Sequence, residues 1–205
     1  MLTRIAVLVS GGGTNLQALI DAQNSGIIKS GEITLVVSNN PGAYALERAK
    51  NAAISTAVVN KKECTSQADF EEKLIAVLEE NNTDLIILAG FMCILSENFT
   101  SKYADRIINV HPSLIPSFCG KGFYGLRVHE AALEYGVKVT GATVHFVNEI
   151  PDGGKIILQK AVDIMPDDTP ETLQKRVMEN AEWIILPRAA EIVSKEIAIT
   201  KERNK

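Results

Sequence analysis

The chain has 205 residues, of which 46% are hydrophobic and 22% are charged, and it carries a formal net charge of −4. This length and composition are typical of one globular domain with a sizeable core, and the charge gives no reason to expect a nucleic acid as a partner. Three dispersed cysteines without a C-x-x-C pair argue against a zinc cluster, and no apolar run is long enough to span a bilayer. We therefore expect a cytoplasmic protein with reduced thiols, no metal site and no membrane contact.

Strand and helix patterns alternate through the first half of the chain. Thr14 is expected to be the N-cap of the first helix, with Gln17 completing a capping-box pattern. The rhythm of the whole half predicts a mostly parallel, doubly wound α/β sheet. The expected strands lie at residues 5–9, 33–37, 56–59 and 85–88 and at the segment that carries Asn109. The expected helices run from Thr14 to about Asn24, from Pro41-Gly42 through Ala49, and from about Phe70 to Asn81-Asn82, with a short helical crossover before the last strand.

The pattern changes after Pro116. Residues 117–127 are predicted to form a loop with several glycines, and a helix is expected at 129–135. The turn Pro151–Gly154 then predicts a hairpin that is appended to the parallel sheet. The strands of this hairpin are expected at residues 139–147 and 156–162.

The C-terminal segment has the pattern of a helix. Thr169-Pro170 is typical of a helix start, because proline is favourable at the first helical position. We expect Pro187 to break or kink this helix, and we expect the polar tail from Thr200 to fray. No repeat, low-complexity segment or interdomain linker is visible, so the chain is predicted to be a single domain.

Three consecutive glycines between a strand and a helix predict a site for an anion. Backbone amides of such a loop, together with the partial positive charge of the helix start, can hold a phosphate. A dinucleotide site is disfavoured, because Leu16 occupies the third glycine position and no acid follows the second strand. A small phosphate monoester fits better, and the alternative is a tight turn that needs glycine only for backbone freedom. The residues expected to hold the phosphate are Gly12, Gly13, Thr14 and Asn15.

Asn109 and His111 are candidate catalytic residues. They lie two apart in an apolar run that ends at Pro112, so both side chains should point to one face at the carboxyl end of a strand, where α/β sheets bind ligands. Asp152 in the flexible turn is the best third partner, and its charge is expected to raise the pKa of His111 so that the imidazole acts as a general acid. Asn109 can donate to a developing oxyanion, an interaction worth roughly 3 kcal/mol. The alternative is an asparagine that satisfies a loop and a histidine that ends a strand.

The remaining histidines and cysteines are not predicted to react. His145 is expected to pack or bond locally near Asp152, and His129 is expected to face solvent at a helix start. Cys93 and Cys119 are interpreted as ordinary small side chains. Because no serine or cysteine lies beside a base, we expect direct transfer with a nucleophile that belongs to the substrate.

Three separated motifs together resemble the phosphoribosylglycinamide formyltransferases, folate-dependent enzymes of purine biosynthesis. They are Ser10–Gln17, then Leu88–Leu95 with Asn109–Pro116, and then Val144–Val147 with Asp152–Gly154. The resemblance covers nearly the whole chain and implies the formyltransferase fold, with a phosphate-binding half at 1–110 and a folate and catalytic half at 111–205. It implies transfer of a formyl group from 10-formyltetrahydrofolate to the amine of glycinamide ribonucleotide, by a monomer or homodimer.

The resemblance also implies roles for single residues. Asn109 and His111 would stabilise and protonate the tetrahedral intermediate, Asp152 would tune His111, and Glu182 would contact the ribonucleotide. Two positions depart from the family, because Cys93 and Gln67 stand where arginine is common, and the chain has one extra residue near 178–182. The residues that would contact folate are Gln67, Met92, Cys93, Ile94, Leu95, Asn109 and His145.

Other functions remain open at this point. Methionyl-tRNA formyltransferase would need a further C-terminal RNA-binding domain, and formyltetrahydrofolate deformylase would need a regulatory domain before the catalytic part. A non-catalytic nucleotide-binding protein is a third possibility. In that protein Asn109, His111 and Asp152 need not meet in space.

Overall fold

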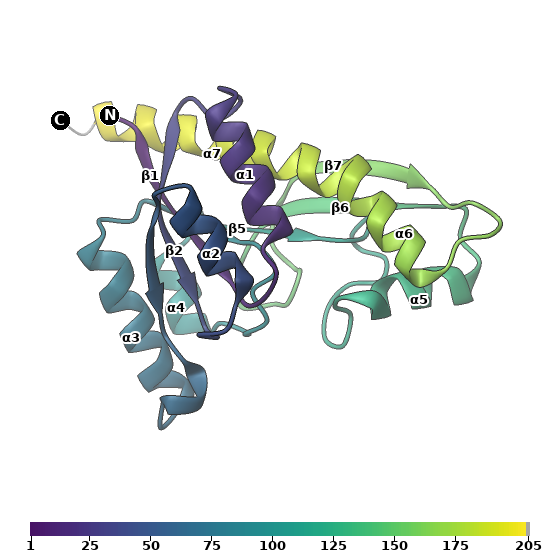
Figure 1. Ribbon diagram of the computed structural model, residues 1–205, viewed down its shortest axis with the longest axis horizontal. Helices are drawn as coiled ribbons and strands as arrows, with labels where there is room; N and C mark the ends of the chain where they lie inside the picture. The colour runs from purple at the N-terminus through teal and green to yellow at the C-terminus, as the bar shows by residue number, and fades with distance from the viewer. Residues whose placement is uncertain (204–205) are drawn as a thin grey trace.

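Seven strands form one sheet in the computed structural model, which describes residues 1–203 (Figure 1). The strand order is β3-β2-β1-β4-β5-β6-β7, with β1 to β5 parallel and with β6 and β7 antiparallel to their neighbours. The predicted doubly wound sheet with an appended hairpin is therefore confirmed. The strands are β1 (Thr3–Val9), β2 (Gly31–Ser38), β3 (Ser55–Val58), β4 (Leu85–Leu88), β5 (Ile107–His111), β6 (Val139–Phe146) and β7 (Ile156–Asp163).

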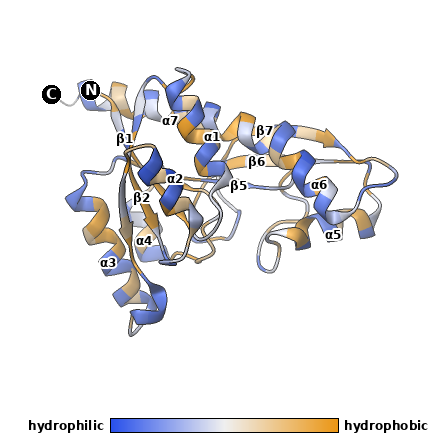
Figure 2. Ribbon diagram, in the orientation of Figure 1, coloured by the Kyte–Doolittle hydropathy of each residue, from blue (hydrophilic) through white to orange (hydrophobic). Residues whose placement is uncertain are grey.

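Helices cover both faces of the sheet, which explains why the central strands β1 and β4 are buried along almost their whole length. In β1, Ile5, Val7 and Val9 belong to one buried cluster, while Ala6 and Leu8 belong to the other. Figure 2 shows the matching hydrophobic stripes on the helices, with polar residues outward. One cluster includes α1 (Thr14–Asn24), α2 (Tyr44–Asn51), α6 (Pro170–Val177) and α7 (Trp183–Arg203), and the other includes α3 (Gln67–Glu80) and α4 (Glu97–Lys102). A further helix, α5 (Leu126–Tyr135), packs against α6.

The start of α1 differs from the prediction. Gly13 is the N-cap, in a left-handed conformation with φ of 73°, and Thr14 is the first helical residue without a side-chain capping bond. The predicted capping box is therefore wrong, because the side chain of Gln17 bonds Asp21 and Arg48 instead. Two other helix starts also differ from the prediction. Helix α2 begins at Tyr44 rather than at Pro41-Gly42, and α5 begins at Leu126, three residues before the predicted start at 129.

The C-terminal helices begin as predicted and then continue further. Thr169 caps α6 by accepting from the Thr172 amide, and Pro170 is the first residue. A π-helical turn at Met178–Glu182 precedes α7, which runs through Pro187 to Arg203, so the predicted break is wrong. We attribute this to the position of the proline close to the wider π turn, where the hydrogen-bond ladder is already altered.

The predicted fraying from Thr200 is also not observed up to Arg203, because α7 extends to that residue and the Thr200 hydroxyl donates to the Glu196 carbonyl. The last two residues, 204–205, lie outside the described residues. The start of β1 lies beside the last turn of α7 (Figure 1), and the N-terminal amine is 3.8 Å from the Glu202 carboxylate. Among residues 1–203, no helix has both the length and the apolar composition needed to cross a bilayer.

The sheet brings the segments that follow β1, β4 and β5 to one edge. Leu8 of β1 pairs with Leu88 of β4, and Leu88 pairs with Asn109 of β5, so the carboxyl ends of these strands are in register. The glycine loop after β1 and the segment 89–95 after β4 therefore lie beside the end of β5. Strand order reverses around β1, and such switch points are where open α/β sheets bind ligands.

Candidate active site

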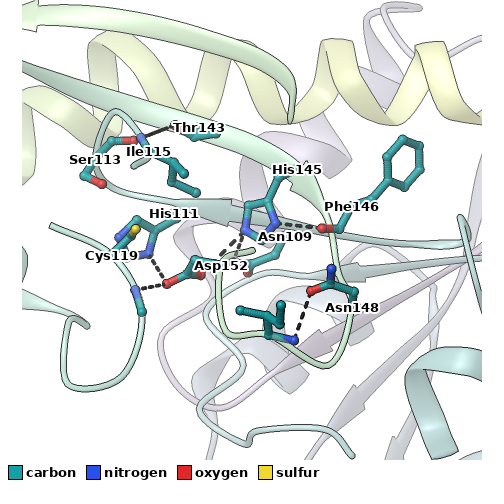
Figure 3. Close-up of polar contacts among 12 residues, drawn as sticks. Asn109, His111, Ser113, Ile115, Cys119, Thr143, His145, Phe146, Asn148 and Asp152 are labelled. Atoms are coloured by element: carbon teal, nitrogen blue, oxygen red, sulfur yellow. Dashed lines mark hydrogen bonds and ion pairs between the residues drawn. The ribbon is translucent and has the colours of Figure 1, made fainter. Parts of the chain in front are cut away.

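Four polar side chains meet at the end of β5 (Figure 3). His111 Nδ1 lies 3.5 Å from Asp152 Oδ2, and His145 Nε2 lies 3.6 Å from Asp152 Oδ1. The amide nitrogen of Asn109 lies 3.3 Å from His145 Nε2. The structure thus brings Asn109, His111 and Asp152 together, with His145 as a fourth member.

Strand register and a glycine turn explain this convergence. Asn109 and His145 are direct partners in the antiparallel β5–β6 pair, so their side chains project side by side. Asp152 has a φ of 56° in the turn between β6 and β7. A Cβ atom on Gly154 would overlap the carbonyl of Phe146, so only glycine lets the turn close this tightly.

Backbone carbonyls determine which nitrogen of each imidazole carries hydrogen. His111 Nε2 lies 2.9 Å from the Phe118 carbonyl, which only accepts, so Nε2 carries the hydrogen and Nδ1 faces Asp152. His145 Nδ1 lies 2.8 Å from the Phe146 carbonyl, so its Nε2 is free to accept from the Asn109 amide. The second N–H of Asn109 remains available to a ligand.

The pKa of His111 moves in the direction opposite to the prediction. Burial lowers this pKa below its ordinary value of 6.5, and the charge of Asp152 raises it only in part. Burial also raises the pKa of Asp152, but the neighbouring imidazoles of His145 and His111 and the hydrogen bond from the Gly120 amide outweigh burial and hold that pKa below its ordinary value. At neutral pH the pair is therefore a carboxylate and a neutral imidazole, which is a proton acceptor first and a donor afterwards.

A cleft of about 700 Å³ extends from these residues. At one end it reaches Asn15, whose amide donates to the Glu182 carboxylate over 2.7 Å. Burial raises the pKa of Glu182 to about 7, so this carboxyl group changes its charge near neutral pH. The predicted residues that line the cleft are Asn15, Met92, Cys93, Ile94, Asn109, His111, Asp152 and Glu182.

The other predicted residues lie around the cleft. Leu95 and His145 line an adjoining pocket of about 140 Å³, together with Asn109 and Asp152. Gln67 lies outside the lining of both cavities, and its amide donates to the Ile94 carbonyl over 3.1 Å and to Glu71. Gln67 thus braces the segment that carries Ile94, a position that the sequence pattern did not reveal.

The first turn of α1 borders both the cleft and a second hollow. Thr14 lines a groove of about 600 Å³ between α1 and α7, whereas the next residue, Asn15, lines the cleft. Gly12 and Gly13 form the loop itself, and a Cβ atom on Gly13 would lie 2.6 Å from that of Ala45. The first amides of α1 have no partners within the helix, as at any helix start, so they are available to an anion.

Two features of the cleft differ from what the sequence predicts or were not predicted at all. His129 is fully buried and lines the cleft, where burial and the neighbouring His111 lower its pKa to about 4, so the predicted solvent-facing role is wrong. The loop 118–125 also covers the site, since the Gly120 amide donates to Asp152 Oδ2 over 2.8 Å and Phe123 lines the cleft. The glycines of this loop were the available signal.

Neither the Cys119 thiol nor a cluster of metal ligands forms a second reactive site in the described part of the chain. Burial and the charge of Asp152 raise the pKa of the Cys119 thiol, which keeps it protonated and weakly nucleophilic. Within residues 1–203, no group of three or more histidine, cysteine, aspartate or glutamate side chains is arranged to hold a metal ion.

Comparison with known proteins identifies the family. The formyl transferase family model matches residues 3–190. The chain is 47% identical over 191 residues to the trifunctional purine biosynthetic protein adenosine-3 of Gallus gallus, covering 93% of this chain but 18% of that protein. It thus spans less than a fifth of the length of such trifunctional relatives.

Single-function relatives match over most of their length. Phosphoribosylglycinamide formyltransferase of Haemophilus influenzae is 44% identical over 186 residues, which cover 91% of this chain and 84% of that protein. The crystal structure of glycinamide ribonucleotide transformylase 1 from Symbiobacterium toebii superposes with a TM-score of 0.89 at 39% identity, covering 95% of this chain and 89% of that one. The chain therefore belongs to the formyl transferase family.

Proposed function

We propose that this protein transfers a formyl group from 10-formyltetrahydrofolate to the amine of glycinamide ribonucleotide, a step of purine biosynthesis. The observation that carries the proposal is the convergence of Asn109, His111 and Asp152 on a cleft that reaches Asn15, in the first turn of the helix that follows the glycine loop. Relatives named phosphoribosylglycinamide formyltransferase or glycinamide ribonucleotide transformylase match most of the chain, and their names support the choice of reaction.

The two substrates would occupy opposite ends of the cleft. The ribonucleotide phosphate would bind the amides of residues 12–15, and Asn15 with Glu182 would receive its ribose. The folate would lie against the largely exposed side chains of Met92 and Ile94, which offer apolar surface to its ring. Cys93, Leu95 and His145 would line the same region, and Gln67 would support it from behind.

The chemistry would be a direct transfer. The ribonucleotide amine attacks the formyl carbon, and the second N–H of Asn109 donates to the oxyanion that forms. Neutral His111 takes the proton of the attacking amine on Nδ1, and Asp152 stabilises the resulting imidazolium. The imidazolium then returns this proton to the departing folate nitrogen, so the formyl carbon–nitrogen bond breaks and tetrahydrofolate leaves.

The organisation of the chain follows from the same proposal. Residues 1–110 would supply the phosphate site, Asn109 and the folate-contacting segment 92–95, and residues 111–205 would supply His111, Asp152 and His145, within one domain. We propose that the protein works in the cytoplasm on these small molecules, without nucleic acid, membrane or metal, as a monomer or homodimer.

The test is a transfer assay that is followed by absorbance as the formyl group leaves the folate. We expect turnover that requires both substrates, and we expect His111→Ala to abolish it while the unfolding curve in urea stays close to that of the wild type. No transfer to glycinamide ribonucleotide by the wild-type protein would contradict the proposal. Unaltered rates in His111→Ala would remove the role of the imidazole.

A further inference from the structure

The side chain of Arg48 reaches from α2 onto the glycine loop. Its Nε donates to the Gly12 carbonyl over 2.8 Å, and its Nη1 donates to the side chain of Gln17 over 3.1 Å. The guanidinium also lies 5.1 Å from the centre of the Tyr44 ring, so a third contact fixes its position. Two directed hydrogen bonds and a stacked ring hold this arginine in one place beside the loop.

The carbonyl oxygens of the three loop glycines all accept hydrogen bonds from within the protein. The Gly11 carbonyl accepts from the Ala45 amide over 3.0 Å, and the Gly13 carbonyl accepts from the Gln17 amide over 2.9 Å. Arg48 engages the carbonyl between them, that of Gly12. Because a free carbonyl oxygen repels phosphate, holding all three leaves the amide hydrogens as the groups that the loop presents to a ligand.

Arg48 also keeps its positive charge. Lys50 on the same helix is paired with Glu47 at 2.8 Å and is exposed, whereas no ion pair to Arg48 is found among residues 1–203. Arg48 is half-buried against the loop, where solvent screens its charge less than at the surface. A dianionic phosphate at the start of α1 would therefore meet this charge in addition to the helix amides.

We propose that Arg48 is a positioning residue for the ribonucleotide phosphate. It holds the Gly12 carbonyl away from the anion, and its unpaired charge makes the loop select phosphorylated over unphosphorylated ribosides. This inference rests on the proposed function for the identity of the substrate. The phosphate site itself can be tested without formyl transfer.

The binding test uses ribose 5-phosphate as the probe, in isothermal titrations of the whole protein. Arg48→Gln is expected to weaken binding about tenfold or more, because a hydrogen bond from a charged donor and a nearby charge are lost together. Lys50→Gln removes an equal charge from the same helix and is expected to bind like the wild type. Arg48→Lys keeps the charge with a single donor group and is expected to recover part of the loss.

Kinetics supply the second readout. In Arg48→Gln the KM for glycinamide ribonucleotide should rise about as much as ribose 5-phosphate binding falls, while kcat and the KM for the formyl-folate stay within about twofold. Equal ribose 5-phosphate affinities for Arg48→Gln and Lys50→Gln would overturn the inference, as would an Arg48→Lys variant no better than Arg48→Gln. Normal phosphate selection by a wild-type protein that does not transfer formyl would instead overturn only the proposed function.

Discussion

Replacing Gly13 with alanine should destabilise the protein far more than the same replacement at Gly12, because only Gly13 has a conformation and a packing contact that require glycine. Gly13 has a φ of 73°, and a Cβ atom there would lie 2.6 Å from Ala45 Cβ and 2.9 Å from Ala45 Cα. Gly12 does not have a positive φ, and a Cβ atom on it would meet nothing within 4 Å. The two substitutions add the same methyl group one residue apart, so Gly12→Ala is a matched control.

The magnitude follows from two terms. A non-glycine residue in the left-handed region costs about 1–2 kcal/mol, and forcing a methyl group into the packed contact with α2 costs about 1–3 kcal/mol. We expect Gly13→Ala to lower the free energy of unfolding by about 2–5 kcal/mol, or the melting temperature by about 5–15 °C for a domain of this size. Gly12→Ala should change stability by less than about 0.5 kcal/mol.

The assay is urea unfolding followed by circular dichroism, together with steady-state kinetics at a temperature where both variants are folded. In Gly13→Ala the loop should shift, and the KM for the ribonucleotide should rise far more than the KM for the formyl-folate. The reason is that only the ribonucleotide is proposed to contact this loop. Equal destabilisation by the two alanines would refute the reasoning about Gly13, and equal effects on both KM values would refute the placement of the phosphate.

Three further changes probe the two ends of the cleft, two at the catalytic residues and one at Glu182. Asn109→Ala removes the amide that would donate to the oxyanion, so kcat should fall about 10²–10³-fold with much smaller changes in either KM; a loss confined to KM would contradict that role. Asp152→Asn removes the charge that partly raises the pKa of His111, so the titration midpoint of the His111 imidazole, measured by NMR, should lie at lower pH than in the wild type. An unchanged midpoint would show that the two groups are not coupled. Burial raises the pKa of Glu182 to about 7 in the folded protein, above the ordinary 4.5, so wild-type stability should fall as pH rises from about 4.5 through about 7. Over this pH range the wild type should lose about 3 kcal/mol more of its free energy of unfolding than Glu182→Gln does, as measured by urea unfolding at several pH values. Parallel pH profiles for the two proteins would argue against a buried carboxyl group.

Local periodicity was sufficient to predict the strands and the pairing of Asn109 with His111 on one face. Both depend on residues two apart along β5, which needs no knowledge of the rest of the fold. Asp152 was within reach of prediction because the two glycines after it mark a turn between two strands. The family resemblance added the identity of the substrates, which no spacing in the chain encodes.

The features that could not be predicted depend on what covers each residue. The direction of the His111 pKa shift is decided by burial, and local periodicity does not show that the loop 118–125 and His129 line the same cleft as His111. His129 was expected to face solvent because it was placed at a helix start, yet it is buried and lines the cleft. The role of Arg48 was also invisible, since its bond to Gly12 joins residues 36 apart in the chain.

The central claim is that the formyl carbon passes directly from the folate to the ribonucleotide amine over Asn109, His111 and Asp152. Single-turnover reactions with a ¹³C-labelled formyl donor, quenched in time and read by mass spectrometry and NMR, test it most directly. We predict label in the new amide of the ribonucleotide, appearing at the rate at which the donor is lost, and none on the protein. Label bound to the protein, or released as formate whether or not the ribonucleotide is present, would contradict the account.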